Sequence, residues 1–302
     1  MCILSIITPH YNMTSSILRA INSVPLEKSQ YIEHIIIDDC SEVSEYNKLA
    51  NLISNSNRNN IKLYRNKDNV GPIKTINDAA KNATGKYLLF LSSDDWLDQT
   101  FISEILCRIL KNVSVGIVVG DLCVSYDNDA YRKKVKSFRD VSEFEVGPPA
   151  ENILDGLVTV VHGQAILRRD LFLKYGPYCE SLRWNSDLFL HVKIATIAGV
   201  HYIPKISGYF NKNYSSYGNK KTYCQQADTL DTLFTLLNQP ENSLVKTVYK
   251  RSGTLGKEPY SLLYLLKNNL FEFINLRFLM KAMLLKIRRY ALVRVANRRR
   301  KL

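Results

Sequence analysis

The sequence lacks the motifs that mark several common protein classes. Its six cysteines lie far apart and form no Cys-x-x-Cys pair, which argues against a zinc ribbon, a redox motif or a disulfide scaffold. It has no Gly-x-Gly-x-x-Gly fingerprint and no Gly-Lys-Ser/Thr loop, which argues against dinucleotide oxidoreductases and P-loop NTPases. No stretch approaches the roughly 20 apolar residues of a membrane-spanning helix. The N-terminal apolar run has no basic segment before it, so we expect a buried strand there and not a signal peptide.

Acidic residues are also missing from one part of the chain. The 302 residues carry a net charge of +13, yet residues 273–302 contain no Asp or Glu and hold ten basic residues. These are Arg277, Lys281, Lys286, Arg288, Arg289, Arg294, Arg298, Arg299, Arg300 and Lys301. The rest of the chain is nearly neutral, so the sequence predicts a local electrostatic device at the C-terminus. With no nucleic-acid-binding motif beside this charge, we expect no nucleic-acid partner.

The first 125 residues alternate strand-like and helix-like segments. Short apolar runs predict strands at residues 3–8, 34–37, 61–64, 87–91 and 115–119. Periodic apolar spacing predicts helices at 15–24, 42–54, 73–82 and 100–110. Repeated β-α-β units predict an α/β fold with a doubly wound, mostly parallel sheet.

The second part of the chain is less regular. Residues 126–150 have no periodicity, and strands are predicted at 159–167 and at 200–203, the latter ended by Pro204. Helices are predicted at 169–175 and 186–198, the second of them amphipathic. From about residue 220 the chain becomes helical. We therefore expect a domain over 1–215, with halves 1–125 and 126–215, and a helical, basic extension over 216–302.

Polar residues follow the predicted strands at their carboxyl ends, where parallel sheets bind ligands. They are the residues at 8–12, Asp38-Asp39, Asn69 and Ser93-Asp94-Asp95. Adjacent carboxylates such as Asp94-Asp95 suit a hard divalent cation that also binds phosphate oxygens. A helix follows them, so a helix-capping role is the alternative.

Several linked blocks resemble family-2 glycosyltransferases. They are residues 5–12, 36–41, 69–71 with Asn77, 83–87 and 89–96, and a later block over 168–187. The resemblance covers roughly residues 1–210. It implies a GT-A fold (a Rossmann-like sheet) and transfer of a sugar, typically a hexose, from a nucleotide-sugar donor with inversion.

The resemblance also implies a nucleotide-sugar site. Tyr11 matches the aromatic residue on which the donor base packs, the alternative being a core aromatic. Asp39 matches the carboxylate that accepts the base N–H, which fits uracil or thymine and favours a UDP-sugar. A turn role is the alternative for Asp39 and for Asp38, which can orient the loop. The implied donor site comprises Pro9, Tyr11, Asp38, Asp39, Asn69, Gly71, Asn77, Ser93 and Asp94.

Asp94 and Asp95 match the family's metal motif and imply Mg²⁺ or Mn²⁺ as a cofactor. Asp95 is expected to hold the cation that bridges the diphosphate, and Asp94 a ribose or sugar hydroxyl. Many members carry a third carboxylate in front of this pair, where this chain has Ser92.

Asp187 matches the family's general base, which deprotonates the acceptor hydroxyl. The Glu that usually precedes it is replaced by Ser186, and a helix-capping role is the alternative. His162, Gly163 and Trp184 are expected near the acceptor, the alternative for His162 being a core histidine. The following loop, residues 209–215, lacks the family's Arg and His, and Lys212 is the candidate to replace them.

The basic C-terminal segment also contains large apolar residues. An interfacial helix followed by basic residues binds anionic lipid; a helix packed on the catalytic domain is the alternative. The leading hypothesis is a cytoplasmic enzyme, peripheral on the inner membrane face, that builds surface polysaccharide on a glycan or lipid-linked acceptor. The rival is a catalytically inactive nucleotide-sugar-binding or scaffold protein of the same fold.

Overall fold

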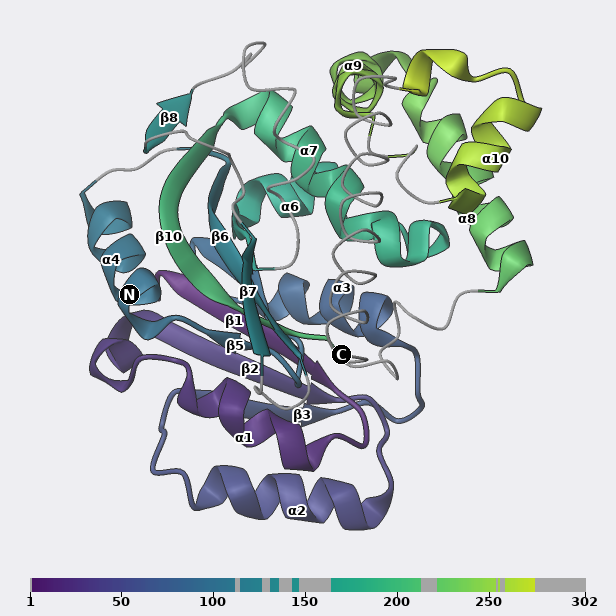
Figure 1. Cartoon of the computed structure of the whole chain (residues 1–302). Helices are drawn as coiled ribbons and strands as arrows, with labels where there is room; N and C mark the ends of the chain where they lie inside the picture. Colours follow the sequence, from purple (N-terminus) through teal and green to yellow (C-terminus); the bar gives the residue numbers. More distant parts are fainter. Residues whose placement is uncertain are drawn as a thin grey trace, which may run out of the picture. The chain divides into compact units, whose positions relative to one another are not determined.

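The computed structural model describes residues 2–111, 115–126, 131–135, 143–146, 164–212, 222–253, 255 and 259–274 (Figure 1). The chain divides into two compact units, Met1–Lys221 and Thr222–Leu302. This division lies close to the boundary that the sequence predicts after residue 215. Part of the strand predicted at 159–167, together with His162, Gly163 and the basic segment from residue 275 onward, lies outside the described residues.

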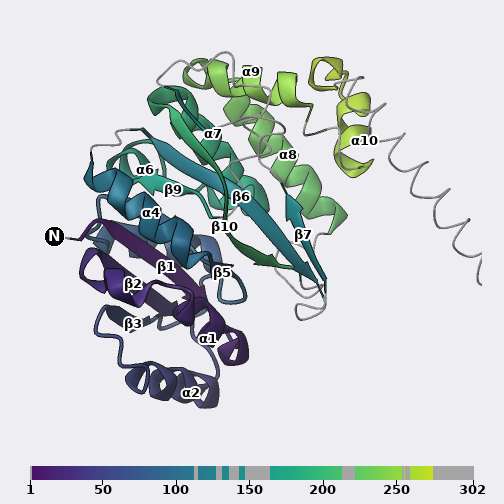
Figure 2. The same cartoon turned by 60° about the vertical axis from the view of Figure 1, so that its left-hand side comes forward.

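A mixed sheet organises the first unit (Figures 1 and 2). Its strands are β1 (Leu4–His10), β2 (Ile32–Asp38), β3 (Ile61–Arg65), β4 (Tyr87–Phe90), β5 (Trp96–Leu97), β6 (Ile117–Tyr126), β7 (Tyr131–Val135), β8 (Phe144–Val146), β9 (Ile166–Arg168) and β10 (Val200–Asn211). The main path runs β3-β2-β1-β4-β9-β6-β10-β5, with β7 beside β6 and β8 beside β10. Strands β3, β2, β1 and β4 are parallel, and β9 enters antiparallel to both β4 and β6. The α/β architecture predicted from the sequence is confirmed.

Helices cover both faces of this sheet. They are α1 (Thr14–Asn22), α2 (Val43–Ser54), α3 (Pro72–Asn82), α4 (Gln99–Leu110), α6 (Arg169–Tyr175) and α7 (Ser186–Ala198), with short 3₁₀ turns η1 (Leu26–Tyr31) and η4 (Glu180–Asn185). Alternate strand residues point to opposite faces. Leu89 of β4 therefore joins the core under α1 and α4, whereas Phe90 packs on Phe172 of α6.

Two predictions for the second half of this unit are wrong. The strand predicted to end at Pro204 continues to Asn211, because Pro204 lies exposed where the register with β6 shifts between Ile203 and Ile206. Proline is tolerated at such a bulge, where its missing N–H breaks no ladder bond. Helix α7 has the predicted bounds but is not amphipathic. Nine of its thirteen residues are buried, because it packs against both α6 and β6.

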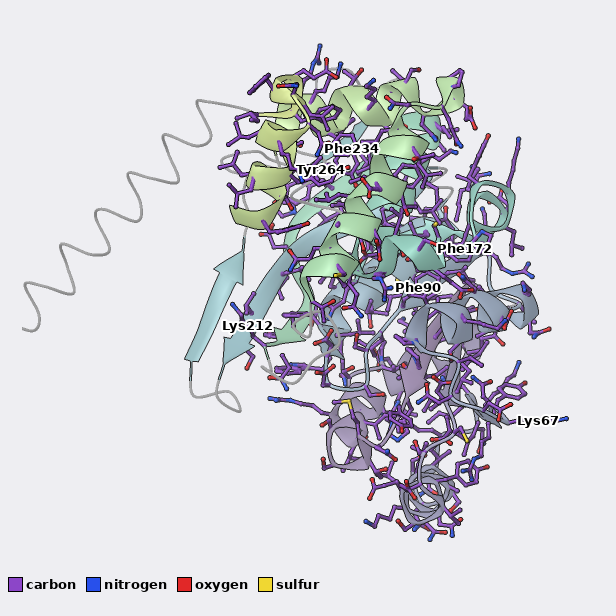
Figure 3. All side chains as sticks on the ribbon, turned by 90° about the vertical axis from the view of Figure 1, so that its right-hand side faces the viewer. Lys67, Phe90, Phe172, Lys212, Phe234 and Tyr264 are labelled. Atoms are coloured by element: carbon purple, nitrogen blue, oxygen red, sulfur yellow. The ribbon has the colours of Figure 1, made fainter. Side chains whose placement is uncertain are left out.

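The second unit is helical in its described part, as predicted. It contains α8 (Tyr223–Leu237), η6 (Pro240–Asn242), α9 (Ser243–Ser252), α10 (Pro259–Lys267) and η8 (Phe271–Phe273). Phe234 stacks on Tyr264 with ring centroids 5.8 Å apart and meets Phe273 edge-on at 5.0 Å (Figure 3 labels the first two). Phe273 is fully buried, so it belongs to this core and not to the basic segment with which the sequence groups it.

Candidate functional site

The loops after β1, β2 and β4 meet at the carboxyl edge of the sheet. In the parallel registers His10 lies opposite Asp38, and Ile7 lies opposite Phe90. The Asp39 N–H donates to the His10 carbonyl at 2.7 Å, and the Ser93 hydroxyl donates to the Pro9 carbonyl at 2.9 Å. The three loops named by the sequence therefore lie side by side, as expected for ends of neighbouring parallel strands.

Asp39 holds the loop that precedes α3. One of its carboxylate oxygens accepts from Asn66 Nδ2 at 2.8 Å and from the Val70 N–H at 3.0 Å, and the other accepts from the Gly71 N–H at 2.8 Å. Gly71 has φ +85°, a backbone conformation that favours glycine. A carboxylate offers about four acceptor positions, so three internal donors leave roughly one for a ligand.

Asp38 is predicted to bind the nucleotide, but its side chain lies inside the protein. Its side chain is fully buried, accepts from the Ser41 N–H at 3.1 Å and lies 3.3 Å from Arg65 Nε. Arg65 also donates to the Ser41 carbonyl and lies over the ring of Tyr46. These contacts give Asp38 a loop-orienting position, which is the alternative that the sequence left open, and its nucleotide-binding role stays a prediction.

Tyr11 and Asn69 remain accessible above this edge. The Tyr11 side chain is 47% exposed, which excludes the core-aromatic alternative and leaves its ring free to stack. Asn69 is exposed beside the segment tied to Asp39, and Pro9 is half-buried. Figure 3 labels Lys67, two residues before Asn69.

Asn77 does not face the nucleotide site. Its Nδ2 donates to the Tyr178 carbonyl and its Oδ1 accepts from the Tyr178 N–H, both at 2.9 Å. The side chain is 5% exposed, and its amide nitrogen and its amide oxygen both bind the same residue. The prediction that Asn77 binds the donor is therefore corrected: it fastens α3 to the segment between α6 and α7.

Asp94 and Asp95 form a close pair of carboxylates in the loop after β4. Asp95 is 6% exposed and accepts from the Asn211 N–H of β10 at 2.8 Å. Burial, and then the charge of Asp94, raise the pKa of Asp95 well above its ordinary value. Burial also raises the pKa of Asp94. Asp98, and not this pair, caps α4 by accepting from the Phe101 N–H, so the capping alternative is wrong.

This donor set fits a divalent cation only in part. Among the described residues there is no group of three or more His, Cys, Asp or Glu side chains placed to hold a metal ion. Two carboxylates with raised pKa values are nevertheless a site that a cation would stabilise, because it removes their mutual repulsion. Mg²⁺ is commonly held by one or two carboxylates together with substrate phosphates. The pair therefore fits a cation that binds together with a diphosphate.

Asp187 lies in the first turn of α7 and is half-buried. Its Oδ1 accepts from the N–H of the next residue, Leu188, at 2.7 Å. Asn185, not Asp187, occupies the cap position, so the capping alternative is wrong here too. Burial, and then the charge of Asp187, raise the pKa of Tyr178 well above its ordinary value. Trp184 is half-buried in η4, just before α7.

Comparisons with known proteins identify the family and the fold of this chain. The model of the family described as glycosyl transferase family 2 matches residues 5–176. The chain belongs to glycosyltransferase family 2. A curated relative, an uncharacterized glycosyltransferase of Haemophilus influenzae, is 25% identical over 193 residues, which are 63% of this chain and 61% of the relative. The chain thus spans about three fifths of that relative's length.

Solved structures share the fold of this family-2 member. S. aureus TarS 1-349 in complex with UDP-GlcNAc matches with a TM-score of 0.66 and 19% identity, over 90% of this chain and 78% of TarS. Mannosyltransferase PcManGT from Pyrobaculum calidifontis, in complex with GDP-Man and Mn2+, matches with a TM-score of 0.52 and 15% identity, over 89% and 80%. At these identities the likeness establishes the fold, and the expected GT-A class is confirmed.

Two departures from the family's pattern have a structural counterpart. Ser92, in the place of a third carboxylate, hydrogen-bonds to Asp95 and thereby opposes the rise of its pKa. Lys212, the candidate for the missing Arg and His, directly follows Asn211, whose N–H binds Asp95. Lys212, labelled in Figure 3, directly follows β10 and donates its backbone N–H to the Ser125 carbonyl.

Several side-chain contacts at this site were not predicted from the sequence. His10 is buried, with Nδ1 3.3 Å from Ser93 Oγ, and burial lowers its pKa. Asn66 joins Asp39 to Thr75 of α3. His191 lies four residues after Asp187 and contacts Tyr178. The helical spacing of Asp187 and His191 was the signal available in the sequence, since residues i and i+4 share a helix face.

Proposed function

We propose that this chain transfers a sugar from a nucleotide-sugar donor, with a UDP-hexose favoured, to a hydroxyl of a glycan or lipid-linked acceptor, with inversion. The observation that carries the proposal is the pair of buried Asp95 and half-buried Asp94 at the same sheet edge as the Asp39 loop. Two carboxylates held close together with raised pKa values weaken a fold unless a ligand relieves them. A divalent cation with a diphosphate is the ligand that suits them chemically.

Each donor group then has a partner in this chain. The base stacks on exposed Tyr11, and its N–H donates to the acceptor position that remains on Asp39. Asn69 and Gly71 flank the ribose, with Pro9 and Ser93 at the floor of the site. Asp95 and Asp94 would hold the Mg²⁺ or Mn²⁺ ion, which neutralises the charge that develops on the departing nucleoside diphosphate. Lys212 adds a positive charge beside this pair.

Asp187 is the proposed general base. In an inverting transfer the base accepts the proton of the acceptor hydroxyl while the oxygen attacks the anomeric carbon opposite the leaving diphosphate. Asp187 lies half-buried at the start of α7, where its Oδ1 accepts from the Leu188 N–H, and we propose that its other carboxylate oxygen accepts the proton of the hydroxyl. Trp184 and the segment at His162-Gly163 are proposed to line the acceptor side.

A membrane surface is proposed as the second partner. The described second unit exposes apolar side chains on α10 and η8: Leu263 is 64%, Leu266 45% and Phe271 57% exposed. The ten basic residues follow directly in the sequence, and apolar groups beside basic charge bind anionic lipid surfaces. Within the described residues, no helix is long and apolar enough to cross a bilayer. We therefore propose peripheral attachment at the cytoplasmic membrane face, with residues 1–215 as the catalytic domain.

The test combines donor binding with turnover. A panel of UDP-sugars is incubated with Mn²⁺, and UDP release is measured for wild type and for Asp187→Asn. We expect UDP–Mn²⁺ affinity by calorimetry to be unchanged in the variant, and turnover to fall about 10²- to 10⁴-fold, the usual contribution of general-base catalysis. Asp170→Asn is the matched control, because Asp170 also lies in the first turn of a helix and is exposed.

The rival function gives a different result. A catalytically inactive nucleotide-sugar-binding protein would bind UDP with Mn²⁺ but release no UDP from any donor, in wild type and variant alike. If Asp187→Asn turns over as fast as wild type, the general base is another residue. Loss of UDP binding in wild type would reject both functions.

A further inference from the structure

Tyr178 is the residue at which the donor half and the Asp187 helix are joined. Its ring packs on Phe90 at 5.2 Å and on Phe172 at 5.1 Å between centroids; Figure 3 labels these two side chains. Phe90 ends β4, which leads directly into the Asp94–Asp95 loop. Asn77 of α3 holds both backbone groups of Tyr178, as described above. The position of Tyr178 is therefore set by α3, β4 and α6 together.

The hydroxyl of Tyr178 reaches the Asp187 helix. It lies 2.7 Å from Nε2 of His191, and both side chains are buried. His191 is one turn after Asp187 on α7. One residue before Asp187, the buried Ser186 hydroxyl donates to the carbonyl of Cys179, the residue next to Tyr178, at 2.5 Å. The first two turns of α7 are thus tied to residues 178–179 on both sides of Asp187.

This arrangement suits a carboxylate that must be held in place while its oxygen stays free to bind the acceptor hydroxyl. Asp187 needs an oxygen free for the acceptor hydroxyl, so it cannot be fixed by many hydrogen bonds of its own. Ties at Ser186 and His191 restrain the backbone that carries it. Catalytic groups lose activity steeply when they move, about 100-fold for a displacement near 1 Å.

We propose that Tyr178 and His191 are positioning residues for Asp187: the Tyr178–His191 hydrogen bond, anchored to the donor half by Asn77, holds the first turn of α7 where the carboxylate meets the acceptor hydroxyl. The proposal rests on the proposed function, because it takes Asp187 as the base. It concerns the geometry of the base and leaves the nucleotide site unaffected.

The test uses Tyr178→Phe, which keeps the ring in the aromatic cluster and removes only the hydroxyl. With the UDP-sugar that wild type turns over fastest, we expect UDP release to fall about 5- to 50-fold at saturating donor, since one buried hydrogen bond is lost and the base is displaced. The affinity for UDP with Mn²⁺ should stay within twofold of wild type. Amides of residues 186–191 should exchange hydrogen faster than in wild type.

A pair of His191 variants gives the matched control. His191→Gln presents a donor and an acceptor near the place of Nε2 and should keep most of the turnover. His191→Leu fills similar space without a polar atom and should behave like Tyr178→Phe. A structural role alone would lower stability in these variants but would not separate turnover from UDP affinity.

The outcomes separate this proposal from the proposed function. If Tyr178→Phe turns over as fast as wild type, or loses turnover and UDP affinity in parallel, the positioning role is overturned. The Asp187→Asn variant still tests independently whether Asp187 is the base. Wild-type turnover in Asp187→Asn rejects the base, and with it the purpose assigned to the Tyr178–His191 pair. If Asp187→Asn lowers turnover and adding Tyr178→Phe lowers it no further, both the base assignment and the positioning role are supported, because the two residues then act as one unit.

Discussion

Replacing Asp95 by Asn is predicted to make the ligand-free protein more stable and to remove its response to Mn²⁺. Asp95 is buried beside Asp94, and its pKa is raised well above its ordinary value, first by burial and then by the neighbouring charge. Each unit of such a shift corresponds to about 1.4 kcal/mol of native-state stability lost when the group is ionised. An Asn side chain keeps an oxygen for the Asn211 N–H and removes the negative charge that repels Asp94.

The expected magnitude is measurable by thermal unfolding. For a domain of 150 to 250 residues, about 1 kcal/mol of stability shifts Tm by roughly 2–4 °C, so we expect the stability gained in Asp95→Asn at neutral pH to appear as a rise in Tm. The pH dependence has a definite sign. The native state keeps protons that the unfolded state releases, so wild-type stability falls as pH rises from the ordinary Asp value of 3.8 through the raised pKa. This fall should be smaller in the variant.

Added ligand should reverse the order of the two proteins. A ligand that binds only the native state stabilises it by about 2.7 kcal/mol at 100 times its Kd. Mn²⁺ with UDP should therefore raise the Tm of wild type and leave that of Asp95→Asn nearly unchanged. Asp98→Asn is the control: the same replacement three residues away, at a helix cap where Asn and Asp are about equally good. If Asp95→Asn is less stable than wild type without metal, or still responds to Mn²⁺, the reasoning is refuted.

Three further predictions concern other parts of the chain. Asn77→Ala leaves the Tyr178 N–H and carbonyl without their partner. It should lower the free energy of unfolding in urea by about 2–6 kcal/mol, at about 1–3 kcal/mol per buried unsatisfied group. The exposed Asn82→Ala should cost far less, and equal losses would contradict the role of Asn77 in holding Tyr178. Burial would raise the pKa of Glu33, but hydrogen bonds to Lys62, Ser5 and Thr84 outweigh it and lower this pKa to about 2. The stability that ionised Glu33 contributes is therefore complete above its ordinary pKa and is lost as pH falls toward 2. Glu33→Gln should flatten the acid side of the stability curve, and an unchanged acid transition would contradict this prediction. Deletion of residues 275–302, which spares buried Phe273, should release the protein from phosphatidylglycerol vesicles in sedimentation while UDP binding is kept; equal sedimentation of both forms would exclude the membrane role of the segment.

Local patterns in the sequence determined the elements of this protein and the edge at which its site forms. The spans predicted for α6 and α7 agree with the structure, and strands β1 to β4 are found within two residues of their predicted bounds. Strands β6 and β10, predicted to end at residues 119 and 203, continue to Tyr126 and Asn211. Strand ends can be located from sequence because apolar runs stop where polar turn residues begin, and parallel strands bring these ends to one edge. Asp39, Asp94 and Asp95 were found in this way.

Tertiary structure decided what each polar side chain does at that edge. Asp38 and Asp39 are neighbours in sequence, yet one is buried against Arg65 and the other binds the loop at Gly71. Asn77 belongs to a donor-site block but contacts Tyr178, a residue 101 positions away. Such partners depend on how helices pack across the sheet, and no local periodicity encodes them. The same applies to α7, which was taken as amphipathic: its polar residues Ser186 and His191 are buried because Cys179, Arg183 and Tyr178, in the segment between α6 and α7, satisfy their hydrogen bonds.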